Sequence, residues 1–532
     1  MDLDRRRASH LAILLLLVAA AIWPYRYILP LLPISRDAIL WVTNADPARE
    51  GFLEWTFASR HFRVGYRPLT ALSFTLDHLI VGTHPLLYRI TDLLLHGGCV
   101  VATWAVFRRL WSETPRRGME LGALVAAMVV AGHPLGEEVV PHLARRGYPM
   151  VSLLSLAAIL ATPRPGPTGA GHPGRALAAA GLATAAAATH EVGYLAYPLI
   201  LVVALWGRPL RDGIVAQRVL LLATGLLAPA SLLVRGVVVG GLGGYRSADA
   251  GALEILWATA GSLAPIVALR APLAPGTSVA VVLSVLWLAV LIAVALPEVR
   301  RPGGMVVALL WLVGLIVLYL PQGVWFPRQV YVLLPPLGML LGGVLAGADG
   351  VRQVPAVMFL VAMGVRAPLW GVDPQARSAQ EHQSALLADL TRAASAAPRG
   401  SELVLVVPWF EAPSSRALRA RTVEERGGVN LGSRSTALWV QRTVPHRGAE
   451  VAVLYSVSPG AEAPLASLVQ DGAAFVLQPP LPDEVTILGR ARARSDGSIL
   501  VPVPPASATE LLLYFYDGDR GVLHPMSPPV GP

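Results

Sequence analysis

Apolar residues in this sequence fall into long runs that are separated by short polar segments. A run of roughly 17 to 22 apolar residues is the length that crosses a bilayer as an α-helix. We expect membrane-spanning helices at residues 11–23, 88–107, 119–133, 150–162, 176–189, 191–206, 219–240, 279–296, 304–320, 329–346 and 354–371. The pattern therefore predicts an α-helical polytopic membrane protein with about eleven transmembrane helices.

The pattern changes after residue 372, where serine, proline, glycine and charged residues become frequent. A helix is predicted at 376–396, and short alternating runs bounded by glycine and proline are typical of strands. These runs lie at 403–409, 437–443, 450–456, 484–490, 498–504 and 510–516. We therefore expect two domains, a transmembrane domain at 1–372 with its first outer loop at about 25–87, and a small α+β domain at 373–532.

Composition agrees with a membrane protein, because 54% of the residues are hydrophobic and only 14% are charged. Soluble domains carry roughly a quarter charged residues. All 43 basic residues are arginine, so a P-loop lysine and a Schiff-base lysine are both excluded. The single cysteine, Cys99, lies in an apolar run, which excludes an internal disulfide and a cysteine-based metal cluster.

The arginines lie beside the apolar runs, which indicates membrane topology rather than nucleic-acid binding. Alternating the chain from a cytoplasmic N-terminus places the loop at 163–175 in the cytoplasm and both the first loop and residues 373–532 outside. Segment 251–269 is then predicted to lie along the outer face. We expect a multi-pass protein of the bacterial inner membrane with a periplasmic C-terminal domain.

The first outer loop holds candidate catalytic groups in Arg36-Asp37, Asp46-Pro47 and Tyr66-Arg67-Pro68-Leu69. A carboxylate at the membrane surface can take a proton from an acceptor hydroxyl, and an arginine can hold a phosphate with two hydrogen bonds. The alternative for Asp37 and Asp46 is helix capping, since aspartate before proline is a common helix start.

A second polar segment runs from His133 through Glu138 and His142 to Arg146. Histidine and glutamate are ordinary metal ligands, but their spacing matches no zinc motif and Pro141 interrupts a shared helix face. Contacts to a phosphate or sugar, a solvated loop with capped ends, and a divalent metal site all remain open, although the spacing does not indicate the metal.

Two further charges lie among apolar residues. Glu191 follows Thr189-His190 between two predicted spans, so it must be paired, protonated or facing a cavity. Arg328 is the single charge between Pro321 and Pro336. A structural hydrogen bond for Glu191 and an interfacial position for Arg328 are the alternatives to a ligand contact.

The order of four segments resembles the C-type membrane glycosyltransferases, and among them the protein O-mannosyltransferase-like group. The segments are YRPLTALSFTLD at 66–77, LYRITDLLLHGGCVVATWAVFRRL at 87–110, AGHPLGEEVVPHLARRG at 131–147 and THEVGYLAYPLILVVALW at 189–206. The resemblance covers about residues 1–372. It implies a polyprenyl-phosphate sugar donor, membrane lipids as surroundings and an extracytoplasmic acceptor, with no partner nucleic acid.

By this resemblance, Asp37 is the general base and Asp46 its reserve. Arg67 and Arg146 are the phosphate ligands, assisted by His133, Glu138, Glu191 and Arg328. The chain departs from the family's pattern at Arg36, Gly136, Tyr148 and His190. These departures keep open an inactive homologue that serves as a structural subunit of a membrane complex. A transporter of lipid-linked precursors is the third class.

Overall fold

The computed structural model describes most of the first 240 residues and separate segments beyond them. The described residues are 2–33, 36–59, 65–112, 116–163, 172–206, 209–240, 303–319, 327–347, 353–366 and 374–396, the strands between 402 and 526, and the isolated positions 259, 286, 289–291, 293, 439 and 443. The chain divides into two units. The first comprises 1–28, 47–77 and 87–371, and the second comprises 29–46, 78–86 and 372–532.

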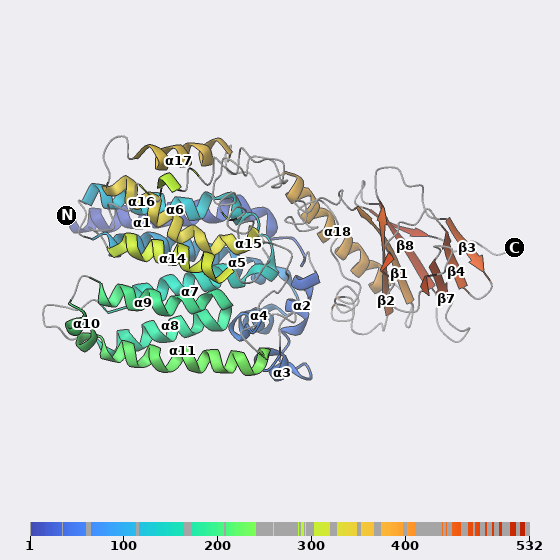
Figure 1. Cartoon of the computed structure of the whole chain (residues 1–532). Helices are drawn as coiled ribbons and strands as arrows, with labels where there is room; N and C mark the ends of the chain where they lie inside the picture. The colour runs from blue at the N-terminus through green and yellow to red at the C-terminus, as the bar shows by residue number, and fades with distance from the viewer. Residues whose placement is uncertain are drawn as a thin grey trace. The chain divides into compact units, whose positions relative to one another are not determined.

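The first unit is built from helices, most of which run alongside one another (Figure 1). Their bounds are α1 Asp2–Ile22, η1 Trp23–Ile28, α3 Phe52–Phe57, α4 Pro68–Val81, α5 Pro85–Leu110, α6 Arg116–Gly132, η2 Pro134–Gly136, η3 Leu143–Arg145, α7 Gly147–Ala161, α8 Pro173–Thr189, η4 Glu191–Leu195, α9 Ala196–Leu205, α10 Leu210–Ala216, α11 Arg218–Val239, α14 Gly303–Tyr319, α15 Pro327–Val330, η7 Tyr331–Leu333, α16 Leu334–Gly347 and α17 Val354–Arg366.

Four of the described segments are long and apolar enough to cross a membrane: His10–Ile28, Pro85–Leu110, Arg218–Val239 and Arg328–Gly347. Shorter apolar helices accompany them at Pro68–Val81, Gly118–Gly132, Glu191–Leu205 and Gly304–Leu318. Leucine and valine side chains of α11 are exposed along one face, as expected of a helix that faces lipid. The protein is therefore a polytopic membrane protein. The run predicted at 279–296 and the segment 251–269 lie almost wholly outside the described residues.

The core of the first unit contains one unusually close helix pair, α6 against α16. A side-chain carbon added to Gly122 would lie 2.6 Å from the carbonyl oxygen of Gly342, and one added to Gly342 would lie 2.3 Å from that of Gly122. Gly338 approaches the carbonyl of Ala126 in the same way, at 2.4 Å. Glycines spaced four apart let two helix backbones touch, as is common in membranes.

Proline is the first residue of two helices that form part of the candidate site. Pro68 is the first residue of α4, and Pro173 is the first residue of α8. Proline suits this position because its fixed φ is already helical and its missing N–H would have no partner there. The chain around each proline is thereby fixed, including Arg67 directly before α4.

The second unit contains α2 (Arg36–Asn44), α18 (Pro374–Ala396) and two sheets. The five-stranded sheet has the order β5-β2-β1-β8-β9, with bounds Val485–Thr486, Glu450–Ser458, Glu402–Phe410, Leu511–Asp517 and Val522–Met526. Strand β1 is parallel to β2 and β8, so that Glu402 pairs with both Glu450 and Leu511. The four-stranded sheet is antiparallel, in the order β3 (Ser467–Asp471), β4 (Ala474–Gln478), β7 (Ile499–Pro502) and β6 (Arg492–Ala493).

Residues 29–46 belong to the second unit, although they lie early in the chain. The backbone N–H of Leu32 donates to the Ser384 hydroxyl of α18 at 2.9 Å. Buried leucines at 386, 387 and 390 line the apolar face of α18. Leu32 is therefore bonded to a helix that lies more than three hundred positions later in the chain.

Candidate functional site

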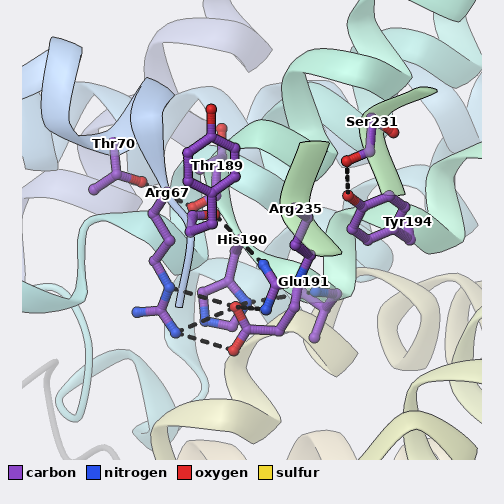
Figure 2. Close-up of polar contacts among 10 residues, drawn as sticks. Arg67, Thr70, Thr189, His190, Glu191, Tyr194, Ser231 and Arg235 are labelled. Carbon is purple, nitrogen blue, oxygen red and sulfur yellow. Dashed lines mark hydrogen bonds and ion pairs between the residues drawn. The ribbon is translucent and has the colours of Figure 1, made fainter. Parts of the chain in front are cut away.

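Arg67 and Glu191 form a two-point ion pair in the first unit. The Arg67 Nη2 lies 3.0 Å from Glu191 Oε1, and its Nε lies 3.4 Å from Oε2 (Figure 2). Their side chains are 12% and 14% exposed, so both are mostly buried but neither is fully buried. A planar guanidinium that grips a carboxylate in this way has the geometry to grip a phosphate.

A second arginine reaches the same carboxylate. Arg235 Nη2 lies 3.9 Å from Glu191 Oε2, and its Nη1 donates to the carbonyl oxygen of Tyr66 at 3.4 Å. Arg235 is 2% exposed and lies on α11, a helix long and apolar enough to cross a membrane. A charge in such a helix is costly and tends to mark function.

His190 completes this group, which we call the Arg67–Glu191 cluster (Arg67, His190, Glu191 and Arg235). His190 Nδ1 lies 3.6 Å from Glu191 Oε2 and accepts a hydrogen bond from the N–H of Val192 at 3.5 Å. Burial, and then nearby arginine charges with Arg67 first, lower the pKa of His190 to about 3. The ring is therefore neutral at physiological pH. The cluster carries two guanidinium charges against one carboxylate.

Three helix ends bring the cluster together. Arg67 precedes α4, His190 follows the last residue of α8, and Arg235 lies in the last turns of α11. The Thr70 hydroxyl on α4 donates to the carbonyl of Thr189 at 3.0 Å, which fastens the start of α4 to the end of α8 (Figure 2). On the other side, the Tyr194 hydroxyl donates to the carbonyl of Ser231 on α11 at 3.0 Å. These neutral hydrogen bonds hold the helices in place around the charges.

Arg146 belongs to a different set of contacts. Its Nη1 lies 2.6 Å from Asp77 Oδ2, its Nε lies 2.5 Å from Asp92 Oδ1, and its guanidinium carbon lies 4.0 Å from the centre of the Phe74 ring. The side chain is fully buried. Burial alone would lower the pKa of Arg146, but the two carboxylates raise it above its ordinary value. Arg146 therefore fastens α4, α5 and the start of α7 to one another.

His133 and Glu138 make contacts within the loop that contains them. His133 Nδ1 accepts from the N–H of Leu135 at 3.2 Å and caps the short helix η2. Glu138 Oε2 lies 3.2 Å from Arg145 Nη1. Within the described residues, no group of three or more histidine, cysteine, aspartate or glutamate side chains is arranged for a metal ion.

The remaining predicted residues lie in different places. Arg328 is on α15, half-buried, and its charge is one of those that lower the pKa of His190. Asp37 and Asp46 lie in the second unit. Asp37 is exposed in the first turn of α2, and Asp46 Oδ1 lies 3.9 Å from His78 Nε2. Of the residues predicted from the sequence, the structure therefore brings Arg67 and Glu191 into direct contact.

Two members of the cluster were not predicted as site residues. His190 was noted only as a departure from a family pattern, although it directly precedes Glu191. Arg235 is the one arginine within the apolar run 219–240. A charged residue inside an apolar run is the sequence signal that identifies it as a candidate.

The sequence matches no family model. It is 40% identical to the protein O-mannosyl-transferase Tmtc1 of Drosophila melanogaster over 81 residues, which are 15% of this chain and 9% of that protein. The chain thus spans less than a tenth of the length of the curated relative that it matches. Over this short stretch, the match confirms the resemblance to protein O-mannosyltransferases.

Among solved structures, the chain is similar to ArnT from Cupriavidus metallidurans bound to undecaprenyl phosphate, with 14% identity and a TM-score of 0.45 over 93% of this chain and 99% of that one. It is also similar to the Archaeoglobus fulgidus oligosaccharyltransferase tethered to an acceptor peptide, with 11% identity and a TM-score of 0.42 over 84% of this chain and 69% of that one.

Proposed function

We propose that this protein is an integral membrane glycosyltransferase that moves a sugar from a polyprenyl-phosphate donor to an extracytoplasmic protein, lipid or envelope glycan. The observation that carries the proposal is the Arg67–Glu191 cluster, where two guanidinium groups share one carboxylate at the ends of α4, α8 and α11, of which α4 and α11 are apolar. The excess positive charge favours an anion, and the surrounding apolar helices favour one that carries a lipid tail. The resemblance to O-mannosyltransferases supports the same function.

The chemistry needs a stabilised leaving group and one base. In a direct displacement at the anomeric carbon, the acceptor oxygen forms the new bond while the bond to the phosphate oxygen breaks. Arg67 would exchange a carboxylate oxygen of Glu191 for a phosphate oxygen and offset the charge that develops on the leaving phosphate. Asp37 is proposed as the base that takes the acceptor proton, with Asp46 in reserve.

The test compares two arginines at opposite ends of the same helix. Arg67 contacts Glu191 beside the C-terminal end of α8, whereas Arg175 is exposed in its first turn and donates to the carbonyl of Leu160. The purified protein is supplied with radiolabelled undecaprenyl-phosphate sugars and a membrane extract as acceptor. We expect Arg67→Gln to lower transfer by about 100- to 1000-fold, the usual effect of removing one donor to a developing anion. Arg175→Gln should leave transfer unchanged.

A second variant separates chemistry from folding. Arg67→Gln leaves Glu191 shielded without its nearest partner, whereas the double variant Arg67→Gln/Glu191→Gln removes both charges and keeps the shape. Because Arg235 stays beside Glu191 in Arg67→Gln, we expect that variant to unfold near the wild-type temperature and still to lose transfer, whereas the double variant leaves buried Arg235 without its carboxylate and should unfold earlier. Wild-type transfer by Arg67→Gln would show that the cluster is not the phosphate site.

The structural-subunit alternative has one observation in its favour. Arg67 is already paired with Glu191, and Arg146 is held by Asp77 and Asp92. A folded wild-type protein that transfers no sugar from any polyprenyl-phosphate donor would establish this alternative in place of the enzyme.

A further inference from the structure

The backbone conformation and an N-cap contact determine which ring nitrogen of His190 carries the proton. His190 has an extended conformation, with φ −158° and ψ 148°, directly after the last residue of α8. It is also the N-cap of η4, where its Nδ1 accepts the N–H of Val192. A neutral imidazole that accepts at Nδ1 carries its proton on Nε2. The N-cap contact therefore leaves the Nε2–H as the ring's single donor.

That donor has no hydrogen-bond partner among the residues that the structure describes. His190 is 2% exposed, and its Nε2 is buried. Most buried polar groups in proteins have a partner, and an exception near a functional site calls for a ligand, a water or an ion. The unsatisfied donor is thus the second sign, beside the excess arginine charge, that something binds here.

The surroundings of the ring favour an anionic partner. The Tyr148 ring packs against it with a centroid distance of 4.7 Å, and Glu191 lies on its Nδ1 side. The charges that act on His190 are those of Arg67, Glu191, Arg235 and Arg328, three cations against one carboxylate. Gly147 at the start of α7 lies against the Cδ2 edge, where an added side-chain carbon would be 3.6 Å away. An acceptor oxygen that meets Nε2 under this positive charge is best supplied by an anion.

We propose that the Nε2–H of neutral His190 donates a hydrogen bond to an anionic oxygen of the phosphate bound by the Arg67–Glu191 cluster. This inference rests on the proposed function and adds a ligand contact at His190. The histidine supplies a directed donor without a further charge, while the arginines supply the charge. The ligand chemistry is that of a phosphate ester or a free phosphate.

Two substitutions separate the Nε2 donor from the N-cap. In His190→Asn, the amide oxygen occupies the place of Nδ1 and continues to cap η4, but the distal donor is lost. In His190→Gln, the terminal amide nitrogen lies as many bonds from the backbone as Nε2, so the donor is kept while the cap is lost. A purely structural role would make the glutamine variant the damaged one.

The experiment measures binding of undecaprenyl phosphate to the full-length protein in phosphatidylcholine nanodiscs, with inorganic phosphate as a parallel arm. We expect His190→Asn to raise the Kd by about 10- to 100-fold, the usual effect of losing a hydrogen bond to a charged group. His190→Gln should stay within a fewfold of the wild type. Tighter wild-type binding of the lipid phosphate than of inorganic phosphate identifies the headgroup as the ligand, and equal binding identifies free phosphate.

The possible results separate failure of the proposed function from failure of the His190 contact. If the wild type binds neither ligand, the proposed function fails, and the histidine contact fails with it. If the wild type binds and both variants bind equally well, a buried water satisfies Nε2 and the inference is overturned while the proposed function stands. Weaker binding by His190→Gln alone would assign His190 to capping and would also overturn it.

Discussion

At the scale of single residues, two arginines that look alike in the sequence differ in their surroundings. Arg67 keeps 12% of its side chain exposed and faces one carboxylate that it shares with Arg235. Arg146 is fully buried and faces two carboxylates of its own. Arg67 can exchange Glu191 for a phosphate ligand because the pair is partly exposed. For Arg146, removing one carboxylate of a buried pair costs about 3–5 kcal/mol. We therefore propose Arg67 as the phosphate ligand and a structural role for Arg146.

The two aspartates of the first outer loop allow a test of the proposed base. Asp37 is exposed, whereas Asp46 faces His78. We expect Asp37→Asn to lower sugar transfer by about 100- to 10,000-fold with folding intact, because the amide keeps the shape but does not accept a proton. Asp46→Asn should cost little, because asparagine keeps the size of the side chain and the distance to His78 is already 3.9 Å. The opposite ranking in the transfer assay would make Asp46 the base.

The sequence predicted single site residues better than their contacts. Arg67 and Glu191 were predicted as candidates because charge among apolar residues is costly and tends to mark function. Their pairing spans 124 positions and depends on how α4 meets α8, which no local pattern encodes. The partners of Arg146 were missed for the same reason, because Asp77 and Asp92 come from two other helices.

At the scale of elements, apolar runs predicted the helices because length and hydropathy decide which segments cross a bilayer. The runs expected at 219–240 and 304–320 coincide with α11 and α14 to within a few residues. The alternating runs at 403–409 and 510–516 overlap β1 and β8. Long-range assembly was not predictable in this way. Nothing local in residues 29–46 indicates that Leu32 bonds to Ser384 of α18.

The α6–α16 contact gives a prediction about helix packing. Gly342→Ala would place a carbon 2.3 Å from the Gly122 carbonyl, so the helices must separate at a cost of about 1–3 kcal/mol. Gly225→Ala on the exposed side of α11 meets nothing within 4 Å and should be neutral or slightly stabilising. Cys99 is the single cysteine and is buried, so a thiol-reactive dye reports unfolding during heating. Equal midpoints for the two variants would contradict the close contact.

At the scale of the whole transmembrane unit, one end of the bundle is marked by arginines. Arg109 on α5 donates to the carbonyls of Leu160 and Thr162 at the end of α7, and Arg175 reaches Leu160 from the start of α8. Near the N-terminus, Arg108 lies 2.9 Å from Glu120. The Arg67–Glu191 cluster lies at the other end of α8, which has 17 residues. At 1.5 Å per residue that helix is about 26 Å long, close to the thickness of the hydrocarbon layer.

We therefore expect the two ends of α8 to face opposite sides of the membrane, with the arginine-rich end in the cytoplasm, because positive loops are retained there. This orientation would place the cluster on the outer side of the membrane, where the proposed donor and acceptor would meet. We expect Ala58→Cys, exposed just after α3, to react with a membrane-impermeant maleimide on spheroplasts, and Thr168→Cys in the loop 163–175 to react only after permeabilisation. Buried Cys99 provides the unlabelled background in the wild type. Labelling of Thr168→Cys from outside would invert the bundle and place the cluster in the cytoplasm, away from any extracytoplasmic acceptor.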